Sequence, residues 1–83
     1  MKHAGPDALL RLQSLLIQLR ARAGMIEKKP GIFYRRGKAF LHFHEDPLGL
    51  FADMSGLAGW DRYAVNTPAE QATFILQLED YFN

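Results

Sequence analysis

The spacing of apolar residues divides the chain into two helical ends and a strand-rich centre. Near the start, leucines recur every three or four residues and predict an amphipathic helix over residues 8–23, which Gly24 ends. Near the end, Thr67-Pro68-Ala69-Glu70 has the spacing of a capping box, in which Glu70 reaches back to the Thr67 cap. A second helix is therefore predicted from Pro68 to about Tyr81.

Between the two helices, residues 31–54 are dense in β-branched and aromatic side chains, which favour a pleated, half-buried surface. Gly37 tolerates a positive φ, so Arg36-Gly37 is predicted to form a tight two-residue turn. Pro47 cannot donate to a sheet ladder and marks a second loop. Three strands are predicted here, over residues 32–36, 38–44 and 50–54.

The remaining segments carry weaker signals. Residues 60–65 have enough aromatic and branched content for a fourth strand. Trp60 is expected to anchor the apolar edge of the domain, and solvent-facing binding by Trp60 is the alternative. Residues 1–5 are expected to be loose, and residues 25–30 to form a short charged connector. The predicted fold is α+β in a single domain over residues 1–83. Its order is α-β-β-β-(β)-α, with an antiparallel three- to four-stranded sheet packed with N- and C-terminal helices.

The register of the predicted hairpins follows from asking which pairing gathers apolar side chains on one face. Placing Arg35 opposite Lys38 and Phe43 opposite Leu50 achieves this. The predicted core face then carries Ile32, Tyr34, Ala39, Leu41, Phe43, Leu50, Ala52 and Met54. The predicted opposite face carries Phe33, Arg35, Lys38, Phe40, His42, His44, Phe51 and Asp53.

Three aromatic residues on that second face predict a contact surface. Phe33, Phe40 and Phe51 would form an exposed patch of the kind that marks an interaction site, unless a helix or another molecule covers them. The leading hypothesis is therefore a non-enzymatic interaction domain that forms a homodimer through this sheet face. Pairing with a different protein is an alternative.

The composition limits the cellular compartments and the kinds of covalent and metal site that are expected for this chain. The chain has no cysteine, which excludes disulfides and thiolate metal sites. No stretch is long and apolar enough to span a membrane, and no signal peptide is recognised, so a soluble cytoplasmic protein is expected.

The charged residues are distributed unevenly along the chain. Residues 1–44 hold nine basic and two acidic side chains, a net +7, whereas residues 45–83 hold seven acidic side chains and Arg62, a net −6. The two halves are expected to neutralise each other in one fold or across a dimer.

Two histidines and an acidic residue form a candidate metal site. His42 and His44 are two residues apart on one predicted strand, so both rings project from the same face, and Asp53 is expected one strand away. Two imidazoles and a carboxylate suit a divalent metal and leave positions open for water. This predicts a small metal-dependent or histidine-based enzyme as the alternative function. The histidines can also be surface or interface residues without a metal, and His3, in the loose terminus, is not expected to join them.

The first hairpin tip supplies a further alternative. Arg35, Arg36 and Lys38 lie in front of Phe33 and Phe40, as in a ribbon that grips phosphates and stacks on bases. Basic hairpin ends are usually solvated without such a function, so nucleic-acid binding ranks below the other two hypotheses.

The segments FLHFHED and GLFAD, within residues 30–80, resemble a group of small uncharacterised bacterial α+β proteins. The layout is also faintly similar to YjbR-like domains and other small domains of unknown function. The resemblance brings no assigned activity. It points to His42, His44, Asp46 and Asp53 as residues of interest.

Overall fold

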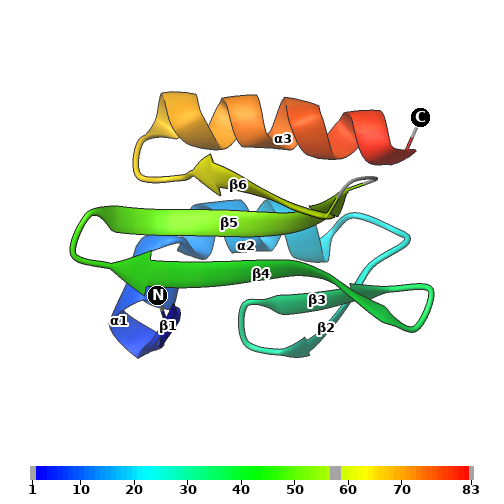
Figure 1. The fold of residues 1–83 in the computed structure, drawn as a ribbon, viewed down its shortest axis with the longest axis horizontal. Coiled ribbons are helices and arrows are strands. Elements are labelled where there is room, and N and C mark those ends of the chain that lie inside the picture. The colour runs from blue at the N-terminus through cyan, green and yellow to red at the C-terminus, as the bar shows by residue number, and fades with distance from the viewer. Residues whose placement is uncertain (1, 57–58, 83) are drawn as a thin grey trace.

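The fold is α+β, as predicted, and combines an antiparallel sheet with helices at both ends of the chain (Figure 1). The computed structural model describes residues 2–56 and 59–82. Five strands follow one another in sheet order: β2 Ile26–Lys29, β3 Ile32–Arg35, β4 Lys38–Asp46, β5 Gly49–Gly56 and β6 Gly59–Ala64. A two-residue strand, β1 Lys2–His3, pairs with the far end of β4.

The predicted N-terminal helix is present but interrupted. It consists of α1, Pro6–Arg11, and α2, Gln13–Arg20, which meet at Leu12 with φ −94° and ψ 7°. The cap position of α1 is Gly5, and Asp7 lies in the first turn. The leucine stripe is buried as expected, with Leu12, Leu15, Leu16 and Leu19 all in the core.

The C-terminal helix, α3 Pro68–Phe82, begins at the capping box that the sequence predicts. The Glu70 backbone N–H donates to Thr67 Oγ1 over 3.1 Å. In return, Glu70 Oε1 accepts from the backbone N–H groups of Asn66, at 2.8 Å, and Thr67, at 3.3 Å. The reciprocal bonds satisfy amide groups that the first turn of a helix leaves without partners.

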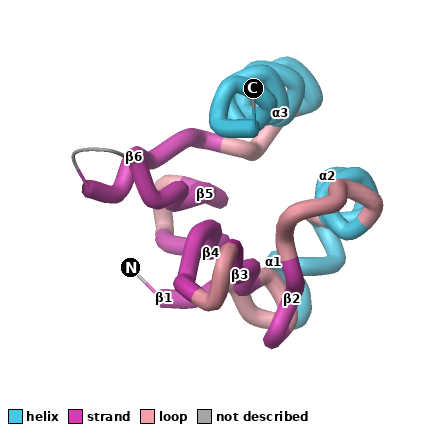
Figure 2. The backbone as a smooth tube through the Cα atoms, turned by 90° about the vertical axis from the view of Figure 1, so that its right-hand side faces the viewer, coloured by secondary structure: helices cyan, strands magenta, loops and turns pink. Residues whose placement is uncertain are grey.

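All the helices lie on one side of the sheet. Seen end-on, α2 and α3 flank the same face of the strands (Figure 2). Between the helices and the sheet lies a core that includes Leu16 and Leu19 from α2, Phe74 and Leu78 from α3, and Leu41, Phe43 and Met54 from the sheet. Within the described ranges, no helix is both long and apolar enough to cross a membrane.

The first hairpin has the predicted turn but not the predicted faces. Arg35 lies opposite Lys38, and both turn residues have positive φ, 55° for Arg36 and 78° for Gly37. Beyond the turn, Tyr34 pairs with Ala39 while Phe33 pairs with Leu41, so Phe40 is an extra residue in β4. This β-bulge changes the alternation of the two strands. Phe33 therefore faces the core beside Leu41, whereas Ile32 faces the opposite side beside His42.

The proposed aromatic contact surface is wrong for the same reason. Phe33 and Phe40 are 1% and 5% exposed, and both belong to the core. Phe40, at the bulge, packs edge-on against Tyr81 and Phe82 of α3. Only Phe51 lies on the predicted opposite face, where it is half-buried. The three rings do not form one patch. Homodimerisation itself stays a prediction.

The second hairpin is displaced by two residues from the predicted register. Phe43 lies opposite Ala52, and Leu50 lies opposite Glu45, because Asp46 and Gly49 close a turn of only two residues. A shift of two residues preserves which face each side chain takes. The prediction that His42, His44, Phe51 and Asp53 share a face is therefore confirmed.

Two strands were not predicted. Residues 25–30 contain β2, which pairs with β3, and residues 1–5 contain β1. The predicted fourth strand over residues 60–65 corresponds to β6, which starts one residue earlier and ends at Ala64. Trp60 does not anchor the core, since it is 50% exposed on the face away from the helices.

Candidate metal centre on the helix-free face of the sheet

The face of the sheet that is turned away from the helices carries two rows of neighbouring side chains. One row runs across four strands through Ile32, His42, Asp53 and Arg62. The adjacent row runs through His3, His44, Phe51 and Ala64. All three histidines of the chain therefore lie on one face, within two rows.

His3 reaches this face because β1 extends the sheet beside β4, in line with β3. Its backbone pairs with His44, and the next residue, Ala4, donates its N–H to the Phe43 carbonyl over 2.9 Å. The Gly5 N–H then donates to Glu45 Oε2 over 2.6 Å. These bonds fix the approach to α1 and place the exposed His3 ring over β4. The expectation that His3 would stay apart from the other histidines is wrong.

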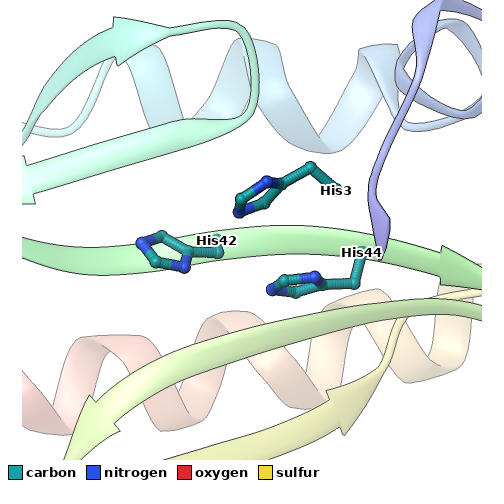
Figure 3. Close-up of side chains that lie close together, drawn as sticks. All are labelled: His3, His42 and His44. Atoms are coloured by element: carbon teal, nitrogen blue, oxygen red, sulfur yellow. The ribbon is translucent and has the colours of Figure 1, made fainter. Parts of the chain in front are cut away.

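The three imidazoles gather around one point (Figure 3). The His3 and His44 rings are stacked with centroids 4.9 Å apart, and the His3 and His42 rings meet edge-on at 5.5 Å. One ring nitrogen from each residue lies within 4.8 Å of the other two. This is the only such cluster of three or more potential ligands among residues 2–56 and 59–82.

Asp53 lies beside the histidine cluster, but its carboxylate is hydrogen-bonded to Arg62. The residue is 8% exposed, and its carboxylate accepts two hydrogen bonds from Arg62, from Nε at 2.8 Å and from Nη2 at 2.9 Å. Asp53 Oδ2 also lies 3.3 Å from His44 Nε2. The two bonds from the Arg62 guanidinium hold the pKa of Asp53 below its ordinary value, so the carboxylate stays charged and orients the His44 ring.

Burial keeps the two strand histidines neutral. It lowers the pKa of His42, and the nearby His3 and His44 rings lower it further. Burial is also the main cause of the lowered pKa of His44, which the negative charge of Asp53 partly opposes. Neutral imidazole is the form that binds a metal ion. Both residues are therefore in the ligating form at neutral pH.

His44 also has a ring nitrogen without a hydrogen bond. The Lys2 backbone favours the protonated ring, but within the described part of the chain no atom meets hydrogen-bond geometry with the buried Nδ1. Buried polar atoms are normally paired. The unpaired atom here, His44 Nδ1, belongs to a residue of the histidine cluster.

Trp60 forms one wall of the cluster. Its ring lies 4.8 Å from that of His42, at an angle of 33°. The indole therefore covers part of the His42 ring, while its other parts stay open to solvent. The sequence predicts instead that this side chain anchors the apolar edge of the domain.

The other candidate residues lie apart from the histidines. Asp46 Oδ1 accepts a hydrogen bond from the Leu48 N–H over 2.8 Å, so it stabilises the β4–β5 turn. Arg35, Arg36 and Lys38 are at the opposite end of β4, beside the C-terminal part of α3. The structure thus brings together His42, His44 and Asp53 as predicted, adds His3 and Trp60, and separates the basic residues from them.

Comparison with known proteins adds no assignment, since no protein-family model, curated protein or solved structure matches this chain.

Proposed function

We propose that this domain binds a divalent transition-metal ion, zinc in particular, through His3, His42 and His44. The observation that carries the proposal is the convergence of three imidazoles from two strands, with their ligand nitrogens within 4.8 Å of one another. Imidazole nitrogen suits zinc, copper, iron and nickel. The absence of cysteine makes histidine the only strong zinc ligand besides the carboxylates.

The cluster needs a modest contraction to hold zinc. Zn–N bonds of about 2.0–2.1 Å in a tetrahedral site place the ligand nitrogens about 3.4 Å apart. The observed limit of 4.8 Å exceeds this by about 1.4 Å, a distance that small side-chain rotations cover. His3 is exposed and lies on a strand of two residues, so it is the ligand most able to move.

The neighbouring residues support the same role. Asp53, fixed by Arg62, orients His44, which is how carboxylates commonly support metal-binding imidazoles. The lowered pKa values of His42 and His44 reduce competition from protons at neutral pH. Three protein ligands would leave a fourth position for water, whose pKa zinc lowers to about 7 in sites of this class.

Isothermal titration calorimetry with Zn²⁺ tests the proposal, using chelator-treated protein that carries no histidine tag. The expected result is one site per chain. His3→Ala should weaken binding by about 100-fold or more, because changes to groups that merely orient a ligand already cost about 10- to 100-fold. The matched control is Lys2→Ala, the neighbouring position on the same exposed strand. Equal zinc affinity in the two variants would refute the three-histidine site.

A further inference from the structure

The far end of β4 holds a second candidate site, unrelated to the histidines. A cavity of about 610 Å³ opens between the β3–β4 turn, the end of β5 and the last turns of α3. These elements meet at the right-hand end of Figure 1. Its walls include Arg35, Arg36, Lys38, Ser55, Gly56 and Tyr81. The volume is in the range of sites for small molecules.

We propose that this cavity binds the phosphate group of an organic phosphate, carried either by a free nucleotide or by a nucleic-acid strand. Three cations line it within four residues of sequence, and two residues that carry hydroxyl groups, Ser55 and Tyr81, also line it. Cations and hydroxyls are the side-chain donors that phosphate oxygens require.

Within residues 2–56 and 59–82, none of the three cations forms an ion pair with an acidic side chain. The ion pairs among the described residues engage Lys2, Arg20, Arg22, His44 and Arg62, but not Arg35, Arg36 or Lys38. Most of the chain's acidic side chains follow residue 44, yet the fold leaves this basic turn unneutralised. Its positive charge is therefore available to an anion.

Arg35 is held in place for such a role. Its guanidinium carbon lies 4.5 Å from the centre of the Phe82 ring and 5.6 Å from that of Phe40. Cation–π contacts with two aromatic rings restrict the movement of the guanidinium. An arginine arranged in this way loses little side-chain freedom when it binds.

Arg36 occupies a position that does not favour arginine. Its φ of 55° is the only positive φ of a non-glycine residue in the described ranges. Tight turns of this kind prefer Asn, Asp or Gly at that position because other side chains are strained there. A cation kept in a strained turn that lines a cavity supports a binding role.

The negative charge of one acidic residue, Asp61, weakens anion binding in this cavity. Its removal therefore tests whether the bound ligand is an anion. A carbon atom added at Gly56 would lie 2.5 Å from both Asp61 Oδ2 and the Tyr81 hydroxyl, so Asp61 sits directly behind the cavity wall. Its charge also contributes, after burial, to the raised pKa of Tyr81. Removing this charge should strengthen anion binding.

The experiment measures binding of inorganic phosphate, adenosine monophosphate and a twelve-residue oligothymidine by calorimetry and fluorescence anisotropy at two salt concentrations. The double variant Arg36→Gly/Lys38→Ala should bind about tenfold more weakly, and Asp61→Asn should bind severalfold more tightly. Because Arg36→Gly removes turn strain, it should raise the melting temperature, so lost binding cannot be attributed to unfolding. The control Lys28→Ala/Lys29→Ala removes the same charge from β2.

The results distinguish a free nucleotide from a nucleic-acid strand as the molecule that carries the phosphate. Binding of the mononucleotide that is as tight as that of the oligonucleotide identifies a nucleotide site. Tighter oligonucleotide binding with a steep salt dependence, reduced in the double variant, identifies a nucleic-acid strand. Failure of all three probes to bind, or equal weakening by the β2 control, would overturn the proposal.

Discussion

His3 lies directly opposite His44 in the β1–β4 pair, and the two rings stack at 4.9 Å. Residues 41 positions apart in sequence are thus joined by one of the shortest strands a sheet can contain. Because β1 has only two residues, its place on β4 depends on a few backbone bonds and on whatever its side chains contact. A metal ion bound by His3 would add a further link between this strand and β4.

The pair formed by Asp53 and Arg62 is predicted to support both stability and the histidine cluster. Arg62→Met would leave an almost buried carboxylate without its two hydrogen bonds, which raises the pKa of Asp53. We expect a lower free energy of unfolding than for the control Arg11→Met, measured by urea denaturation with chelator present. The double variant Asp53→Asn/Arg62→Met should recover part of the loss. A single variant as stable as the control would contradict this account.

The metal-free protein is predicted to lose stability between neutral and mildly acidic pH. The pKa values of His42 and His44 are lowered from 6.5 in the folded chain, mainly by burial. Below about pH 6.5 the unfolded chain therefore binds more protons than the folded chain, so acid favours unfolding. Urea unfolding in chelator at pH 7.5 and pH 5.5 measures the effect, and His42→Asn should reduce it. Equal stability at the two values would show that these rings are not buried as described.

Phe33 is predicted to be a core residue and Phe51 a peripheral one. Phe33→Ala should lower the free energy of unfolding by about 3–5 kcal/mol, the usual result of emptying a buried aromatic site. Phe51→Ala, on the helix-free face, should cost clearly less because its side chain is only half-buried. Chemical denaturation of the pair is the measurement. Equal losses would favour the register without a bulge, in which both rings share one face.

Trp60 is predicted to report metal binding. It is the only tryptophan in the chain, and its ring lies 4.8 Å from that of His42. Binding of zinc to His42 changes the charge next to the indole, so its emission should change in proportion to the bound metal. His42→Ala should abolish the response, whereas Lys38→Ala, on the same strand, should preserve it. A response that survives in His42→Ala would place the metal elsewhere.

The sequence predicted the elements with strong local signals and missed those that depend on a partner. The capping box at Thr67, the turn at Arg36-Gly37 and the leucine stripe each act within a few residues, and all three are present. In contrast, β1 and β2 are short and mainly polar. These segments are extended because they pair with the open edges of β4 and β3. Local residue propensities do not predict such pairing.

The site was predicted in part for a similar reason. Alternation along one strand placed His42 and His44 on one face, and the pairing of β4 with β5 added Asp53. The contribution of His3 required knowing that the N-terminal segment pairs with β4. The error at Phe33 came from a bulge, since one extra residue in β4 reverses the alternation for part of the hairpin.

The most direct test of the three-histidine site is a long-range ¹H–¹⁵N NMR spectrum of the imidazole rings during zinc titration. The chain contains only three histidines, all in the cluster, so an untagged sample shows no other ring signals. The account predicts that all three rings shift together and that the changes are complete at one zinc ion per chain. A titration in which His3 keeps its metal-free signals, or in which no ring reaches saturation, would contradict it.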